Sequence, residues 1–222
     1  MKRYADNRAF ALCYRVAALV IIAAGLADIS GLLSGEINPH VFLSYTVQSN
    51  VLVWLFFAFC TIKTARAKVG QHYPFGFWPA ASFAVTIAIL ITMLLFWAIL
   101  APTSWAGGHL LTFSNFAVHL ICPILMIFDR FIFYQPGKIG RLEPLAVFIF
   151  PYMHVAQSFI IGLNRLVYFA PLRIESYYIY PFLDYDAQGN MVFLYILGLS
   201  LIFLGISYGW RHLENKYAAK RK

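Results

Sequence analysis

The stretch WPAASFAVTIAILITMLLFWAILA, from Trp78 to Ala101, contains no charged side chain. A helix needs about 20 mostly apolar residues to cross the hydrocarbon core of a bilayer, and this stretch is long enough. Five other stretches meet the same requirement. The six predicted spans are residues 11–33, 42–62, 78–101, 112–133, 145–163 and 191–210. The sequence therefore predicts an all-α polytopic membrane protein, a six-transmembrane-helix bundle that forms a single domain over residues 1–222.

The composition excludes an ordinary soluble protein. The chain is 61% hydrophobic and 12% charged, whereas about a quarter of the residues in a soluble domain are charged. The net charge of +8 raises the possibility of nucleic-acid binding, but the basic residues stand at the ends of the apolar runs, as membrane topology requires. We expect membrane lipids and no nucleic acid as partners. Cys13, Cys60 and Cys122 show no metal-ligand spacing and are interpreted as buried packing thiols, so no metal is expected.

The basic residues also orient the chain. Fifteen of the 17 lysines and arginines precede or open the first span, surround the gaps after the second and fourth spans, or close the chain. The positive-inside rule therefore predicts that both termini are cytoplasmic. The basic start and the apolar run from Val16 to Leu26 also fit a signal peptide. Because the run continues to Leu33, we favour a retained first helix.

Polar side chains inside the predicted spans are the candidates for function. A polar group at membrane depth is costly, so it usually faces the bundle interior and often marks a functional site. At 1.5 Å per residue, Asp28 lies about 8 Å, Thr46 about 6 Å and His119 about 10 Å below the outer ends of their spans. The sequence therefore predicts one polar layer in the outer half of the bundle.

Helical phase and a proline support a cavity in this layer. Thr46 and Asn50 are four residues apart and share a face, and so do Asn115 and His119. Pro123 removes the hydrogen bond to the His119 carbonyl and is expected to kink the helix there. Such a break widens a bundle locally and leaves space for a ligand.

The chemistry that this layer offers is acyl transfer. A threonine hydroxyl becomes a nucleophile when a base removes its proton, and histidine has a pKa suited to that role. We predict Thr46 as the nucleophile and His119 as the base. Asn50, Ser49 and Asn115 are candidate oxyanion donors, and Asp28 or Asn115 is a candidate for orienting the imidazole. The alternative is that these groups only bond to their own backbone or join neighbouring helices.

Three motifs carry a family resemblance. They are SYTVQSNVLV from Ser44 to Val53, HLICPIL from His119 to Leu125 followed by Asp129, and YPFLD from Tyr180 to Asp184. In order and spacing they resemble the bacterial six-helix relatives of the androgen-induced gene 1 protein. The resemblance covers about residues 11–210.

The animal members of that family include the androgen-dependent regulator of tissue factor pathway inhibitor. They are multi-pass hydrolases that cleave fatty acid esters of hydroxy fatty acids with a threonine nucleophile and a histidine. The resemblance implies the same roles for Thr46 and His119, a lipid ester substrate, no cofactor, and a place in the bacterial cytoplasmic (inner) membrane.

Two other functions stay open. A polar outer cavity with Asp28 and Arg165 at its mouth would bind or transport an amphiphile without chemistry. His119 and His154 would alternatively serve as axial haem ligands. The loop over residues 164–190 is rich in tyrosine and is either an interfacial aromatic belt or a lid that includes Tyr180. Asp184 in this loop either reaches the site or caps the last helix.

Overall fold

The computed structural model describes residues 2–67, 73–102, 112–169 and 174–219 of the chain. Within these ranges it contains helices and no strand, and six of its helical segments are long and apolar enough to cross a membrane. These segments are Arg8–Ile29, Tyr45–Arg66, Pro79–Leu100, Phe113–Phe133, Glu143–Leu163 and Met191–Ala219. The protein is therefore an all-α bundle of six membrane-spanning helices, as the sequence predicted.

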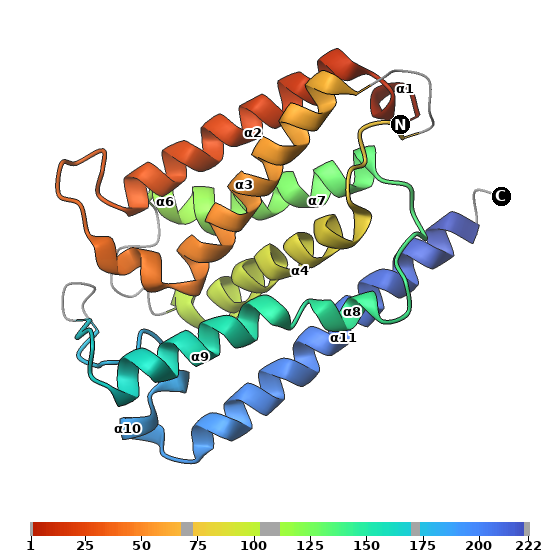
Figure 1. Ribbon diagram of the computed structural model, residues 1–222. Helices are drawn as coiled ribbons and strands as arrows, with labels where there is room; N and C mark the ends of the chain where they lie inside the picture. Colours follow the sequence, from red (N-terminus) through yellow and green to blue (C-terminus); the bar gives the residue numbers. More distant parts are fainter. Residues whose placement is uncertain (1, 68–72, 103–111, 170–173, 220–222) are drawn as a thin grey trace.

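Three of the six spans are interrupted and the other three are single α-helices (Figure 1). The single helices are α2 (Arg8–Ile29), α3 (Tyr45–Arg66) and α11 (Met191–Ala219). The third span is α4 (Pro79–Leu95) followed by the π-helical turn η2 (Phe96–Leu100). The fourth is α6 (Phe113–Phe116), the π-helical turn η3 (Ala117–Ile121) and α7 (Cys122–Phe133). The fifth is α8 (Glu143–Ala146) and α9 (Ile149–Leu163). The short elements are α1 (Lys2–Ala5), η1 (Pro39–Leu43), η5 (Pro181–Leu183) and α10 (Tyr185–Gln188).

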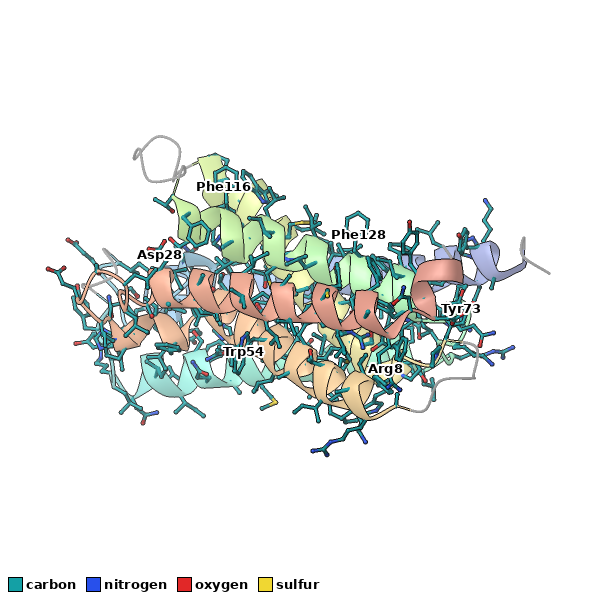
Figure 2. All side chains as sticks on the ribbon, turned by 90° about the horizontal axis from the view of Figure 1, so that it is seen from above. Arg8, Asp28, Trp54, Tyr73, Phe116 and Phe128 are labelled. Atoms are coloured by element: carbon teal, nitrogen blue, oxygen red, sulfur yellow. The ribbon has the colours of Figure 1, made fainter. Side chains whose placement is uncertain are left out.

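The two termini lie at the same end of the bundle (Figure 1). In the view from above, Arg8 and Tyr73 lie towards that end, and Asp28 and Phe116 lie towards the other (Figure 2). An even number of spans requires both ends of the chain to be on one side. The assignment of that side to the cytoplasm stays a prediction from the basic residues.

The end of the first span and the start of the second span differ from the predicted ones. The first span ends at Ile29 because Gly31 has a φ of +78°, which a helix does not contain. The second begins at Tyr45, because the Ser44 hydroxyl caps it by accepting a hydrogen bond from the Val47 amide. Thr46 is consequently the second residue of α3, and not the fifth residue of a span that begins at residue 42.

Two buried ion pairs hold the end of the bundle that carries the termini. Arg15 of α2 donates to both carboxylate oxygens of Asp129 in α7, at 2.8 and 3.2 Å, and both side chains are fully buried. Arg130 donates in the same two-pronged way to Glu214 of α11, at 2.6 and 3.2 Å. The second pair lies in the part of α11 that continues beyond the predicted end at residue 210.

The cysteines are only partly as predicted. Cys60 and Cys122 are buried packing residues, whereas Cys13 is exposed on the outside of α2. The prediction for Cys13 was wrong because an apolar run does not show which face of the helix points into the bundle.

Candidate functional site

The structure brings the predicted nucleophile and base together. The Oγ1 of Thr46, near the start of α3, lies 3.3 Å from the Nε2 of His119 in η3. Thr46 is one residue and His119 six residues from the start of its span, a difference of about 7.5 Å along the helix axes. The side chains still meet, so the contact does not require the two residues to lie equally far from the starts of their helices.

The hydrogen bonds around His119 determine which ring nitrogen carries the proton. Its Nδ1 lies 3.2 Å from the backbone carbonyl oxygen of Asn115. A carbonyl only accepts, so Nδ1 carries the proton and donates it. Nε2 therefore has a free lone pair, which accepts the Thr46 hydroxyl proton. This is the tautomer that a general base requires, and Asn115 orients the imidazole through its main chain.

The local distortion at His119 follows from Pro123. Proline has no amide proton, so the His119 carbonyl lacks the partner four residues on that a regular α-helix would give it. The carbonyl instead accepts a hydrogen bond of 3.1 Å from the indole Nε1 of Trp97, and the chain passes through the π-helical turn η3. Turns of this kind are frequent at functional sites. The ring of Phe96 stacks on the imidazole with centroids 3.6 Å apart and planes 11° from parallel.

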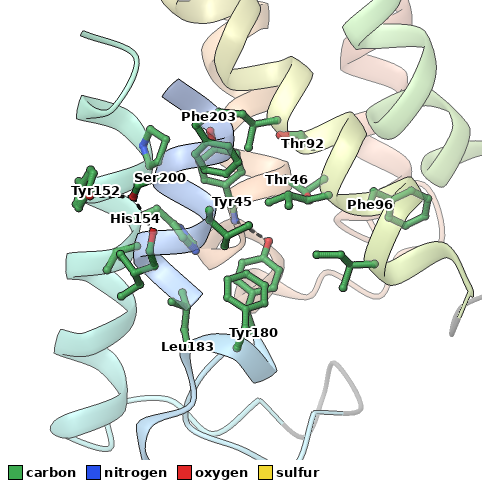
Figure 3. Close-up of a pocket in the computed structure, with 18 of the residues that line it drawn as sticks. Tyr45, Thr46, Thr92, Phe96, Tyr152, His154, Tyr180, Leu183, Ser200 and Phe203 are labelled. Atoms are coloured by element: carbon green, nitrogen blue, oxygen red, sulfur yellow. Dashed lines mark hydrogen bonds between the residues drawn. The ribbon is translucent and has the colours of Figure 1, made fainter. Parts of the chain in front are cut away.

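Thr46 lines an open cavity of about 80 Å³ at the end of the bundle away from the termini (Figure 3). A single water molecule needs roughly 10–15 Å³ on this measure, so the cavity has room for a small polar group but not for a whole lipid. Its walls come from α3, α4, η2, α9, α11 and η5, and most of them are apolar. The polar or aromatic-polar lining residues are Tyr45, Thr46, Thr92, Tyr152, His154, Tyr180 and Ser200. His119 is only 4% exposed and lies behind Thr46 and Phe96.

Tyr180 connects the loop before α11 to the start of α3. Its hydroxyl accepts a hydrogen bond of 3.1 Å from the Tyr45 amide and also interacts with Thr46. Burial raises the pKa of Tyr180 above its ordinary value, even though these neighbouring groups oppose the rise. The phenol therefore keeps its proton at neutral pH and has an O–H to donate. The tyrosine-rich loop thus supplies one wall of the cavity through Tyr180, Phe182 and Leu183.

Two of the predicted oxyanion donors have their protons engaged elsewhere. The Asn50 amide nitrogen donates to the carbonyls of Thr46 and Val118, at 2.8 and 3.1 Å. The Ser49 hydroxyl is fully buried between the Thr46 carbonyl and the Thr92 hydroxyl. Both residues support the helix that carries the nucleophile, and neither lines the cavity.

The two predicted carboxylates are helix caps. Asp28 accepts a hydrogen bond of 3.0 Å from the Ser114 amide at the start of α6. Asp184 accepts from the Ala187 amide at the start of α10, at 2.9 Å, and from the Ser176 hydroxyl, at 2.6 Å. Neither lines the cavity. The orienting role proposed for Asp28 is filled by the Asn115 carbonyl, and Asp184 caps α10 and not the last helix.

The binding and haem alternatives do not fit the residues chosen for them. Arg165, expected at the cavity mouth, forms an exposed ion pair with Asp186 and does not line the cavity. Both ring nitrogens of His119 have hydrogen-bond partners, which leaves no nitrogen free for an iron ligand. His154, by contrast, lines the cavity and belongs to a hydrogen-bonded network that the sequence did not reveal.

Comparisons of the chain with protein-family models, with curated proteins and with solved structures found no match. Support for a function therefore comes from the fold, the site geometry and the sequence motifs.

Proposed function

We propose that this protein is an intramembrane hydrolase of lipid esters, with Thr46 as nucleophile and His119 as general base. The observation that carries the proposal is the hydrogen-bonded row from Thr46 Oγ1 to His119 Nε2 and from His119 Nδ1 to the Asn115 carbonyl. The 3.3 Å distance from hydroxyl to imidazole is long, but catalytic hydrogen bonds are often long before substrate binds. The three sequence motifs that resemble those of the androgen-induced gene 1 protein family favour the same two roles.

The reaction divides into two steps. The Thr46 oxygen attacks the ester carbonyl carbon while its proton passes to His119 Nε2, and the alcohol then leaves with that proton. A water molecule next attacks the acyl-threonine, again giving its proton to His119, and the fatty acid is released with Thr46 restored. The oxyanion would receive a hydrogen bond from the Tyr180 phenol and would lie near the positive end of the α3 dipole.

The cavity and the membrane determine how a lipid would bind. The cavity has room for the ester group, so the acyl chain extends from it along apolar side chains into the bilayer. We propose the bacterial cytoplasmic (inner) membrane as the location and the family's fatty acid esters of hydroxy fatty acids as the first substrates to test.

The proposal is tested with p-nitrophenyl oleate and protein purified in detergent micelles. We expect a burst of p-nitrophenol, and an oleoyl group on the peptide that contains Thr46, identified by mass spectrometry. Thr46→Val keeps the side-chain shape without the hydroxyl and abolishes both signals. His119→Phe keeps a ring against Phe96 without the base and lowers the burst rate by about 10²–10⁴-fold.

Thr92→Val is the matched control, because it removes a different hydroxyl from the same cavity wall. We expect it to retain the burst and the labelling of Thr46. Equal labelling of wild type, Thr46→Val and His119→Phe would refute the hydrolase proposal. In that case the remaining function would be the binding of an amphiphile without chemistry.

A further inference from the structure

A second imidazole faces the cavity from α9. His154 is 5% exposed and lines the cavity together with Tyr45 and Tyr180, whose rings lie edge-on to it with centroids 5.5 and 5.6 Å away (Figure 3). Its Nδ1 lies 3.2 Å from Gln48 Oε1. Gln48 is not part of the cavity lining, and its bond to Nδ1 leaves the second ring nitrogen, Nε2, of this cavity-lining histidine unused.

The network behind His154 determines its protonation. Gln157 donates to the Leu43 carbonyl at 3.0 Å, so its own amide oxygen faces Gln48. Gln48 donates to that oxygen at 2.8 Å and to the Phe42 carbonyl at 3.1 Å. Because the two carbonyls only accept, the directions of both amides are determined, and the oxygen of Gln48 faces His154. His154 therefore donates from Nδ1 and has a bare lone pair on Nε2.

This Nε2 is buried and has no hydrogen-bond partner among the residues that the structure describes. A buried acceptor without a donor costs about 1–3 kcal/mol. The described residues that line the cavity include no lysine or arginine, so nothing there neutralises a carboxylate or a phosphate. A neutral lone pair would also repel an anion, whereas it would bind a hydroxyl.

We propose that the cavity selects a neutral ester amphiphile with a free hydroxyl near its ester group, and that His154 Nε2 accepts the hydroxyl proton. This inference rests on the proposed function, because it takes from it that the ligand is an ester. It does not require that the protein hydrolyses the ester. It names a partial ester of a diol or polyol, with an uncharged head group, as the ligand class. This class differs from the fatty acid esters of hydroxy fatty acids, which carry a carboxylate and no free hydroxyl, and we expect it to bind in preference to them. His154 would act as a specificity residue, and the alcohol side of the ester would lie towards α9.

The test compares 2-hydroxyethyl oleate with 2-methoxyethyl oleate, in which a methyl group replaces the hydroxyl proton. The His154→Phe variant separates loss of the donor from the size of the added methyl group. Their affinities are measured by thermal-shift titration in detergent micelles, in a Thr46→Val background that prevents turnover. We expect the hydroxy ester to bind about 5- to 10-fold more tightly, as one hydrogen bond to a buried acceptor predicts. Adding His154→Phe should bring the ratio to about one. Adding Tyr152→Phe, which removes another polar group of the cavity wall, should leave the ratio unchanged.

A ratio near one in the Thr46→Val background would overturn the inference without any change at His154, so the result does not depend on the folding of that variant. A preference that survives His154→Phe would overturn it as well. Acylation of Thr46 without a hydroxyl preference would leave the hydrolase standing and remove this inference. A hydroxyl preference without acylation of Thr46 would leave this inference standing and remove the hydrolase.

Discussion

Breaking the buried ion pair between Arg15 and Asp129 should strongly destabilise the bundle. The guanidinium donates to both oxygens of Asp129, and its remaining protons go to the Thr64 hydroxyl and to the carbonyls of Cys60 and Phe75. Asp129→Leu leaves Arg15 buried with uncharged acceptors only. Removing one partner of such a pair costs about 3–5 kcal/mol, and arginine cannot lose its proton to escape the cost.

The reverse change should cost less. Arg15→Met leaves the Asp129 carboxyl group buried without its partner, and a proton can neutralise it. We therefore expect the free energy of unfolding to fall by about 2–3 kcal/mol. The double variant replaces both charges by apolar groups of similar size, and such replacements are often close to neutral. The double-mutant cycle should therefore give a coupling energy of several kcal/mol. The measurement is SDS-driven unfolding in mixed micelles, followed by circular dichroism and tryptophan fluorescence.

The pair of Arg165 and Asp186 is the matched control. Its nitrogen and oxygen are 3.4 Å apart, but the two side chains are 61% and 49% exposed. Asp186→Asn should change the free energy of unfolding by less than about 1 kcal/mol, because exposed pairs contribute little. A loss below about 1 kcal/mol for Asp129→Leu, or additive losses in the Arg15 and Asp129 cycle, would refute the reasoning.

Three further changes test other parts of the structure. Gly25→Ala would place a Cβ 2.6 Å from the Cβ of Ala117. We therefore expect the free energy of unfolding to fall by about 1–3 kcal/mol in the same assay. An unchanged free energy of unfolding would contradict the close contact. Asp28→Ala removes the acceptor for the Ser114 amide and should cost about 1 kcal/mol, with Asp28→Asn retaining most of the stability. Thr46→Ser keeps the nucleophilic hydroxyl, so its burst rate with p-nitrophenyl oleate should stay within roughly tenfold of wild type, and a complete loss would argue against a hydroxyl nucleophile.

The sequence predicted the spans well because hydrophobic length is a local property. Trp78 to Ala101 is apolar throughout, and no tertiary contact is needed to recognise it. The ends of the spans depend on single residues instead. The cap at Ser44 shortened the second span, and the buried pair of Arg130 with Glu214 accompanies an α11 that runs beyond the predicted end. A count of apolar residues does not detect either effect.

The sequence predicted the contact between Thr46 and His119, but it did not reveal the hydrogen bonds of His154. Thr46 and His119 carried a usable signal, since both are polar residues in apolar runs and Pro123 marks a broken helical turn. Asn115 was one of the two residues predicted to orient the imidazole, but the group that does so is its main-chain carbonyl, and a backbone carbonyl leaves no signature in a sequence. His154 had a signal of the same kind as His119. Its role depends on hydrogen bonds to Gln48, more than 100 positions earlier, which pattern analysis does not provide.

The buried ion pairs and the uncharged cavity lie towards opposite ends of the bundle. At the end with the termini, Arg15 and Arg130 form buried ion pairs that join α2 and α11 to α7. At the other end the polar side chains that line the cavity are uncharged, two spans contain π-helical turns, and the cavity-lining His154 has an unpaired nitrogen. Distorted turns and unpaired polar atoms reduce stability, and they persist where the surrounding structure holds them in place. The ion pairs are therefore expected to provide stability without constraining the cavity. On this reasoning the double variant of Arg15 and Asp129 should retain the burst with p-nitrophenyl oleate, even where its unfolding midpoint has changed.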